Sequence, residues 1–129
     1  AAIATKSIKE VKYHLRFSSE WMKRLGAGTE ESHNKMQAAV DYLYPYTGEL
    51  YKPSEVEAEM LDYGIGADLA AVEARFLEMV NTICKQGNLT LPKVSRFQSG
   101  GKQGIHSEYM GFILADLQYM QRTYPEMQW

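Results

Sequence analysis

The clearest structural signal in the sequence is the stretch Asp68–Gly87, DLAAVEARFLEMVNTICKQG. Its apolar residues recur every three or four positions, as side chains on one face of an α-helix do. Asp68 is a favourable N-cap, and Gly87 is a residue type that commonly ends helices. Lys85 lies in the last turn, where a positive charge complements the helix dipole. The stretch therefore predicts a helix over residues 69–86. Its apolar face is formed by Leu69, Val72, Phe76, Met79, Val80 and Ile83.

The same helical periodicity extends outward over most of the chain. Thr29 is a plausible N-cap for a second helix that should end near Tyr44 and Pro45. Ser54 and Glu57 have capping-box spacing before a short helix that stops by Gly64. The other expected elements are helices over residues 2–25 and 105–122 and a long loop over residues 88–104. No segment alternates as a strand does, so the predicted fold class is all-α.

Charge and composition exclude some classes of protein. The 129 residues carry 14 Lys and Arg against 16 Asp and Glu, a net charge of -2 that excludes a generally basic nucleic-acid binder. Residues 1–26 carry six basic and two acidic side chains, or +4, whereas residues 30–80 carry three and eleven, or -8. Such a division suits pairing within or between subunits, or simply two solvated faces of opposite sign.

The single cysteine and the hydropathy set the expected environment. Cys84 has no partner for an internal disulfide, and its apolar surroundings favour a buried structural thiol over a nucleophile. No apolar run approaches the roughly 20 residues that span a bilayer. We therefore expect a cytoplasmic protein with no membrane or nucleic-acid partner.

Two potential metal ligands share a face of the first predicted helix. Glu10, His14, Phe17 and Trp21 recur every three or four residues, so they share one face of this helix. Polar side chains beside a buried apolar surface need hydrogen-bond or ion-pair partners. Di-iron proteins of the helical-bundle type use Glu-x-x-His pairs. Glu10 and His14 are one residue further apart, and Val11 occupies the carboxylate position. Glu10 and His14 are therefore compatible either with a metal site or with a buried ion pair or hydrogen-bond network.

Glu30 and His33 do have Glu-x-x-His spacing. They fall in the first turn of the second predicted helix, where acidic residues stabilise the positive end of the helix dipole. This position favours a capping and packing role over a metal site.

A glycine-rich segment precedes the last predicted helix and contains Gly100, Gly101, Lys102 and Gly104. It departs from a phosphate-binding loop, because Ile105 follows Gly104 and no strand precedes it. The segment could still hold an anion or a partner's carboxylate. His106 and Glu108 are two residues apart and point to different sides of a helix, so they do not easily chelate one ion.

Five segments, taken in order, resemble the C subunits of the multicomponent ring-1,2-phenylacetyl-CoA epoxidases. They are KEVKYHLRFS at 9–18, GTEESH at 28–33, YTGEL at 46–50, GGKQGIHSE at 100–108 and LADLQYMQR at 114–122, followed by the terminal Trp129. The resemblance runs along the whole chain.

The resemblance implies a ferritin-like helical bundle about twice as long as this chain. Residues 1–129 would form the C-terminal part of that single domain, with three N-terminal bundle helices missing. The helix over residues 2–25 would be the last core helix, and it should then expose Phe17, Trp21, Glu10 and His14.

The resemblance also implies a structural, non-catalytic subunit in aerobic phenylacetate degradation. In these complexes the A subunit binds the di-iron centre and phenylacetyl-CoA, and its C partner supports it. The expected partners are therefore the catalytic A subunit and the other subunits of the complex. This chain would hold no cofactor, and Glu10 and His14 would be a vestigial metal site. Family-motif or interface candidates are Glu30, His33, Gly100, Gly101, Lys102, Gly104, His106 and Glu108.

Two alternatives stay open. The first is an active di-iron oxygenase, which stoichiometric iron in the purified full-length protein would favour. The second is an unrelated helical interaction module, which a stable monomer with a cooperative thermal transition would favour.

Overall fold

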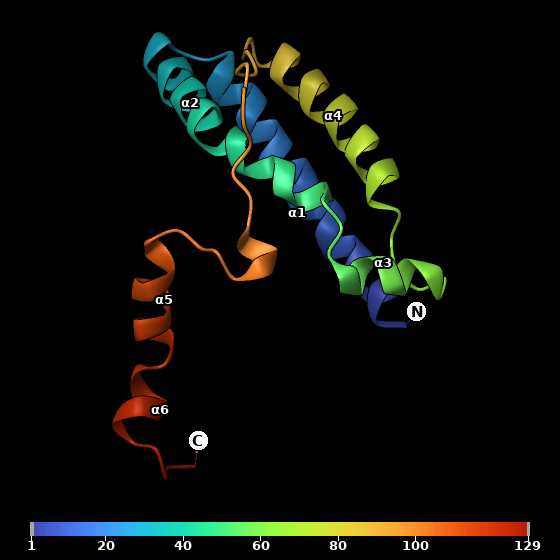
Figure 1. The fold of residues 1–129 in the computed structure, drawn as a ribbon. Helices are drawn as coiled ribbons and strands as arrows, with labels where there is room; N and C mark the ends of the chain where they lie inside the picture. Colours follow the sequence, from blue (N-terminus) through green and yellow to red (C-terminus); the bar gives the residue numbers. More distant parts are fainter. Residues whose placement is uncertain (1, 129) are drawn as a thin grey trace. The chain divides into compact units, whose positions relative to one another are not determined.

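The computed structural model describes residues 2–128, and this range is helical without any strand, which confirms the all-α prediction. Trp129, which closes the resembling segments, lies outside the described residues. The chain divides into two compact units, Ala1–Gln98 and Ser99–Trp129. Helices of the first unit are α1 (Ala2–Gly26), α2 (Glu30–Leu43), the 3₁₀ helix η1 (Tyr44–Tyr51), α3 (Glu55–Asp62) and α4 (Leu69–Gln86) (Figure 1).

The first unit is built around α1, which packs against both α2 and α4 (Figure 1). Val40 from α2, Cys84 from α4 and Leu89 from the following loop form the buried cluster. Burying aliphatic side chains such as Val40 and Leu89 contributes roughly 1.5–3 kcal/mol each. Partly buried side chains that pack against the cluster are Met22, Met36, Val80 and Leu91.

Three predicted helix starts are confirmed by their caps. The side chain of Thr29 accepts a hydrogen bond from Ser32 N, and Asp68 accepts from two amides at the start of α4. Ser54 and Glu57 form the complete reciprocal capping box of α3. Each cap satisfies backbone donors that the helix itself leaves unpaired.

Two glycines allow the backbones of α1 and α4 to meet where both helices end. Gly26 is buried, and a Cβ atom added to it would clash with the carbonyl oxygen of Gly87 and lie 2.8 Å from Leu89 Cγ. A Cβ atom on Gly87 would lie 3.1 Å from the carbonyl oxygen of Met22. The close approach therefore depends on both positions lacking a side chain.

The 3₁₀ helix η1 was not expected. Pro45 ends α2 where the sequence predicts, but the chain continues as a tighter helix through Tyr51. The Thr47 hydroxyl donates to the carbonyl of Tyr44 at 2.8 Å, and the Tyr44 ring contacts Phe97 with centroids 5.8 Å apart. Because Phe97 is distant in sequence, local patterns could not predict this element.

The loop after α4 is anchored to the first unit by hydrogen bonds over long sequence separations. Gln37 Nε2 donates to the carbonyl of Thr90 at 2.7 Å, and Thr90 N donates to Gln37 Oε1 at 2.9 Å. Gln98 N donates to the carbonyl of Pro45 at 3.0 Å. The predicted loop over residues 88–104 is confirmed, apart from a single 3₁₀ turn, η2 (Gly101–Gln103).

In the second unit, the prediction of one helix over residues 105–122 is wrong. The structure has α5 (Tyr109–Leu117) and α6 (Tyr119–Thr123), separated at Gln118, where φ is -98° and ψ is 0°. The start is late because Ile105 N donates back to the carbonyl of Gly100 at 2.8 Å. Within residues 2–128, no helix has both the length and the hydropathy that crossing a bilayer requires.

Candidate functional site

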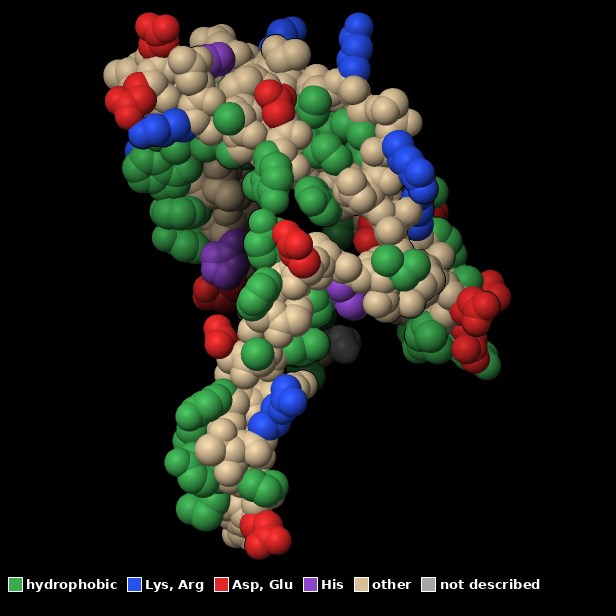
Figure 2. Space-filling view, turned by 60° about the vertical axis from the view of Figure 1, so that its left-hand side comes forward, with side chains coloured by type: hydrophobic (Ala, Val, Ile, Leu, Met, Phe, Trp, Pro, Cys, Tyr) green, Lys and Arg blue, Asp and Glu red, His purple; other side chains and the backbone are tan. Residues whose placement is uncertain are grey.

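One face of α1 carries a ladder of exposed aromatic side chains. Tyr13 and Phe17 are stacked with ring centroids 6.0 Å apart, and Phe17 meets Trp21 edge to face at 6.2 Å. Phe17 and Trp21 are 53% and 44% exposed. Contiguous exposed aromatic surface of this kind usually marks a contact with another protein segment. Many hydrophobic side chains are visible at the surface in the space-filling view (Figure 2).

Glu10 and His14 lie on this same helix and are exposed. The His14 ring contacts the Tyr13 ring edge to face, with centroids 5.9 Å apart. Among residues 2–128, no group of three or more His, Cys, Asp or Glu side chains comes together to hold a metal ion. A di-iron carboxylate centre of the helical-bundle type uses four Glu and two His. The described residues therefore do not fit such a centre.

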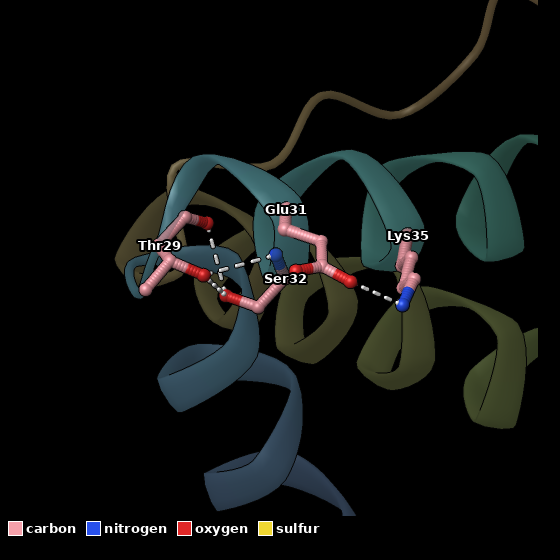
Figure 3. Close-up of polar contacts among 4 residues, drawn as sticks. All are labelled: Thr29, Glu31, Ser32 and Lys35. Atoms are coloured by element: carbon pink, nitrogen blue, oxygen red, sulfur yellow. Dashed lines mark hydrogen bonds and ion pairs between the residues drawn. The ribbon is translucent and has the colours of Figure 1, made fainter.

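The predicted N-cap residue Thr29 closes the turn between α1 and α2 together with Ser32 (Figure 3). Ser32 N donates to Thr29 Oγ1 at 3.2 Å, and Ser32 Oγ lies 2.8 Å from the carbonyl oxygen of Leu25. On the outer side, Lys35 Nζ pairs with Glu31 Oε1 at 2.6 Å (Figure 3). That pair is solvent-exposed, so it adds only about 0.3–0.5 kcal/mol. The bonds of Ser32 close the turn and tie the start of α2 to the end of α1, whereas the Lys35–Glu31 pair lies within α2.

His33 is engaged in the same turn. Its Nδ1 lies 2.7 Å from the carbonyl oxygen of Gly26, an acceptor that the helical hydrogen bonds of α1 leave unpaired. Glu30 is exposed in the first turn of α2, where its charge complements the helix dipole. The Glu-x-x-His spacing therefore has a structural account in helix capping and in the α1–α2 junction.

The glycine-rich segment folds into a turn closed by its own backbone. Gln103 N and Ile105 N donate to the carbonyl of Gly100 at 3.0 and 2.8 Å, and Gly104 N donates to the carbonyl of Gly101 at 3.0 Å. Gly100 and Gly104 have φ values of 113° and 82°, which favour glycine. Because these amides are already paired, they do not form the open ring of donors that cradles a phosphate.

His106, Glu108 and Lys102 are exposed in this second unit. Glu108 precedes α5 without making a side-chain cap. Neither His106 nor Glu108 belongs to a cluster of potential metal ligands among residues 2–128.

An apolar groove of about 450 Å³ lies between α1, α2, η1 and α4. Among the described residues that line it, Tyr44 and Thr47 carry hydroxyl groups, and the Thr47 hydroxyl already donates to the Tyr44 carbonyl. No local sequence pattern predicts this groove, although its Met and Tyr residues are of the types that core and interface surfaces use. The lining residues are Met22, Met36, Ala39, Val40, Leu43, Tyr44, Thr47, Phe76, Val80, Cys84 and Leu91.

Burial controls the titration of two groups in the first unit. Burial raises the pKa of the Cys84 thiol above its usual value, and the residue is only 2% exposed. Burial, together with the charge of Glu73 and the nearby Tyr44, raises the pKa of Tyr51. A raised thiol pKa keeps Cys84 protonated near neutral pH, so its chemistry is that of a structural residue and not of a nucleophile.

Comparison with known proteins covers the whole chain. Residues 1–129 match the family described as "Phenylacetic acid catabolic protein". The chain is also similar to the C subunit of the 1,2-phenylacetyl-CoA epoxidase of Escherichia coli (strain K12), at 40% identity over 129 residues. The match includes 100% of this chain and 52% of that relative, so the chain spans about half the length of the relative.

Proposed function

Because the chain belongs to the phenylacetic acid catabolic protein family, we propose that it is a structural, non-catalytic subunit of a phenylacetyl-CoA ring-1,2-epoxidase. In this role it supports a catalytic A subunit, and the di-iron centre belongs to that partner. The similarity to the C subunit of an epoxidase supports the choice of complex.

The observation that carries the non-catalytic role is the composition of the α1 face. Glu10 and His14 are the side chains of this face that we consider as metal ligands. Beside them lies the aromatic ladder of Tyr13, Phe17 and Trp21. A dinuclear iron centre needs ligands from four helices. Aromatic side chains contribute contact area for packing and supply no iron ligand here. The face is therefore suited to holding neighbouring helices.

The sparse core supports a role within a larger assembly. In the described chain, the buried hydrophobic residues are Val40, Ile83, Cys84 and Leu89. Many large apolar side chains stay exposed, among them Phe112 and Leu117 of α5 at 71% and 70%. Exposed apolar surface is stabilised only when another segment or subunit removes it from water. Assembly with partners would supply that burial.

As part of the proposal, residues 1–129 form the C-terminal part of a single ferritin-like domain, and three bundle helices precede them. Two observations support this: the chain covers 52% of the length of its relative, and the Phe17 and Trp21 face of α1 is uncovered. Preceding helices packed on that face would place Glu10 and His14 in the bundle interior, as a vestigial metal site. The protein would work in the cytoplasm, where Cys84 stays reduced.

Native mass spectrometry of the protein purified from its own cells tests this function. We expect a chain about twice as long as these 129 residues, free of iron and associated with an iron-bearing partner. A subunit that carries two irons by itself would contradict the non-catalytic role. A subunit that never co-purifies with an iron protein would contradict the assignment to the complex.

A double variant separates a vestigial site from a working one. Glu10→Gln with His14→Gln removes both potential ligands while preserving side-chain size. If the site is vestigial, the iron content of the complex and its epoxidase activity should change less than about twofold, since losing even a hydrogen-bond partner of a working metal ligand usually costs tenfold or more. Glu31→Gln, an exposed position in α2, is the matched control. Loss of iron in the double variant alone would contradict the proposal.

The second candidate function is an active di-iron oxygenase. The shared location of Glu10 and His14 on one exposed face of α1 favours it, because ligands from other helices could complete such a site. The iron stoichiometry of the isolated subunit discriminates between the two functions. Family membership excludes the alternative of an unrelated helical module.

A further inference from the structure

A row of three cations without an ion-pair partner follows the outer surface of α1. Lys9, Lys12 and Arg16 are spaced i, i+3 and i+7, so they share one side of the helix, and all three are exposed. Within residues 2–128, none of them has a carboxylate within ion-pairing distance, and Glu20, one turn after Arg16 on the same side of α1, is paired with Lys23. The Arg16 guanidinium instead lies over the Tyr13 ring, 5.9 Å from its centroid. We call Lys9, Lys12 and Arg16 the basic stripe.

A matching row of anions lies on α3. Glu55, Glu59 and Asp62 are spaced i, i+4 and i+7, are exposed, and have no cationic partner among the described residues. Glu57 lies apart from them, since its carboxylate closes the capping box with Ser54. We call Glu55, Glu59 and Asp62 the acidic stripe. Each stripe spans seven residue steps of helix, and both are therefore about 10 Å long.

We propose that the basic stripe of one copy pairs with the acidic stripe of a second copy, and reciprocally, in a two-fold symmetric dimer. Both stripes belong to the compact unit Ala1–Gln98, so one symmetry operation can form both contacts at once. The equal number, equal length and opposite sign of the charges favour a second copy as the occupant. This inference is independent of the epoxidase role.

Apolar side chains beside the stripes would supply the rest of the contact, because exposed ion pairs alone are weak. On the helical wheel, Ile8 lies beside the basic stripe on the side away from the aromatic ladder, and it is 49% exposed. Val56 and the C-cap residue Tyr63 lie together on one side of the acidic stripe and are 65% and 68% exposed. This contact does not need the Phe17 and Trp21 face of α1.

A polyanion is a poorer occupant of the basic stripe. Residues 30–80 carry a charge of -8 and the whole chain -2, so nucleic acid or an anionic membrane would be repelled by much of the same molecule. Pairing two copies through α1 alone would place basic stripe against basic stripe. Exchange of α1 for α3 between two copies neutralises both stripes.

Charge reversal of the full-length protein tests the dimer by sedimentation velocity. One variant is Lys9→Glu, Lys12→Glu, Arg16→Glu, and its counterpart is Glu55→Lys, Glu59→Lys, Asp62→Lys. Each variant alone should dimerise at least about tenfold more weakly than the wild type, because both contacts become repulsive. An equimolar mixture should form a heterodimer, because in that pair both contacts are attractive again.

A control variant with the same change in net charge carries Lys85→Glu, Lys93→Glu and Arg96→Glu, and it should dimerise like the wild type. Circular dichroism establishes that each variant is folded. Dimerisation of the wild type should also weaken between about 50 and about 500 mM salt, because salt screens exposed charges.

Three results would overturn the proposal. The first is a monomeric wild-type protein at low salt. The second is a mixture of the two reversed variants that fails to associate. The third is loss of a different co-purifying protein from the α1 variant without rescue by the α3 variant, which would assign the basic stripe to that other protein.

Discussion

The Nδ1 atom of His33 lies 2.7 Å from the carbonyl oxygen of Gly26, and this contact joins the start of α2 to the end of α1. Ser32 Oγ, beside it, lies 2.8 Å from the carbonyl oxygen of Leu25. Two carbonyls that α1 cannot satisfy internally are thus paired by side chains of the next helix. The α1–α2 angle is therefore set by hydrogen bonds as well as by apolar packing.

Replacing His33 should loosen this junction. His33→Ala removes the donor to the Gly26 carbonyl and should destabilise the protein by about 1 kcal/mol, as a lost neutral hydrogen bond usually does. Urea denaturation of the full-length protein measures the change. His106→Ala is the matched control, since the His106 side chain is exposed. This control should change the free energy of unfolding by less than about 0.5 kcal/mol. Equal effects in both variants would contradict the role of His33.

A side chain at Gly26 should separate α1 from the end of α4. Gly26→Ala places a methyl group against the carbonyl oxygen of Gly87 and the Leu89 side chain, at a cost of about 1–3 kcal/mol. Gly111→Ala is the control, because a Cβ atom there meets nothing within 4 Å and Gly111 lies inside α5. That control should be neutral or stabilising by up to about 1 kcal/mol. Thermal unfolding that ranks the two variants the other way would show that the helix ends are not tightly packed.

Gln37 should be sensitive to a change of its amide to a carboxylate. Its Nε2 donates to the carbonyl of Thr90 and to Asp41 Oδ1, at 2.7 and 2.9 Å. Gln37→Glu replaces this donor with a negative acceptor facing two other acceptors, so it should destabilise by about 1–3 kcal/mol. Urea denaturation measures the change, because the new carboxylate can still accept from Thr90 N, and hydrogen exchange of that amide would not report the lost donor.

Gln121→Glu, at an exposed position of α6, is the control for this change and should leave the free energy of unfolding unaltered. A Gln37→Glu variant as stable as the wild type would show that the loop is not anchored through the Gln37 amide.

Cys84 should react slowly with thiol reagents in the folded protein. Burial raises its pKa, so its thiolate fraction at pH 8 is below that of a free cysteine, and access is restricted as well. Reaction with 5,5′-dithiobis(2-nitrobenzoate) should be slower than for glutathione, because the raised pKa lowers the thiolate fraction and burial restricts access to the sulfur. Unfolding in urea should restore the rate of a free thiol. Fast labelling of the folded protein would contradict the burial of Cys84.

The same shift predicts a sign for the alkaline dependence of stability. Below about pH 8.5, the ordinary pKa of an unfolded cysteine, both states keep the proton, and the stabilisation from the buried neutral thiol is fully present. As the pH rises toward the higher pKa of the folded state, the unfolded state loses its proton first. The free energy of unfolding therefore falls as the pH rises through this window. In the Cys84→Ser variant it should fall less steeply with pH.

Local chemistry in the sequence was sufficient for most helix starts. Thr29, Ser54 and Asp68 act through amides two or three residues away, so their caps could be recognised from spacing alone. The second unit differs, because a local contact that spacing does not reveal decides where its helix begins. The helical periodicity after Gly104 is genuine, but the hydrogen bond from Ile105 N to the Gly100 carbonyl competes with a helix start there.

By itself, the sequence determined the all-helical class, the family and the positions of the caps, because these depend on residue types at short spacing. Only the tertiary structure revealed that Phe97 packs on Tyr44, that Gly26 meets Gly87, and that His33 bonds to Gly26. The apolar groove between α1, α2 and α4 likewise combines residues from Met22 to Leu91. Such contacts arise when helices already formed are brought together, and the distance between two residues along the chain does not encode that packing.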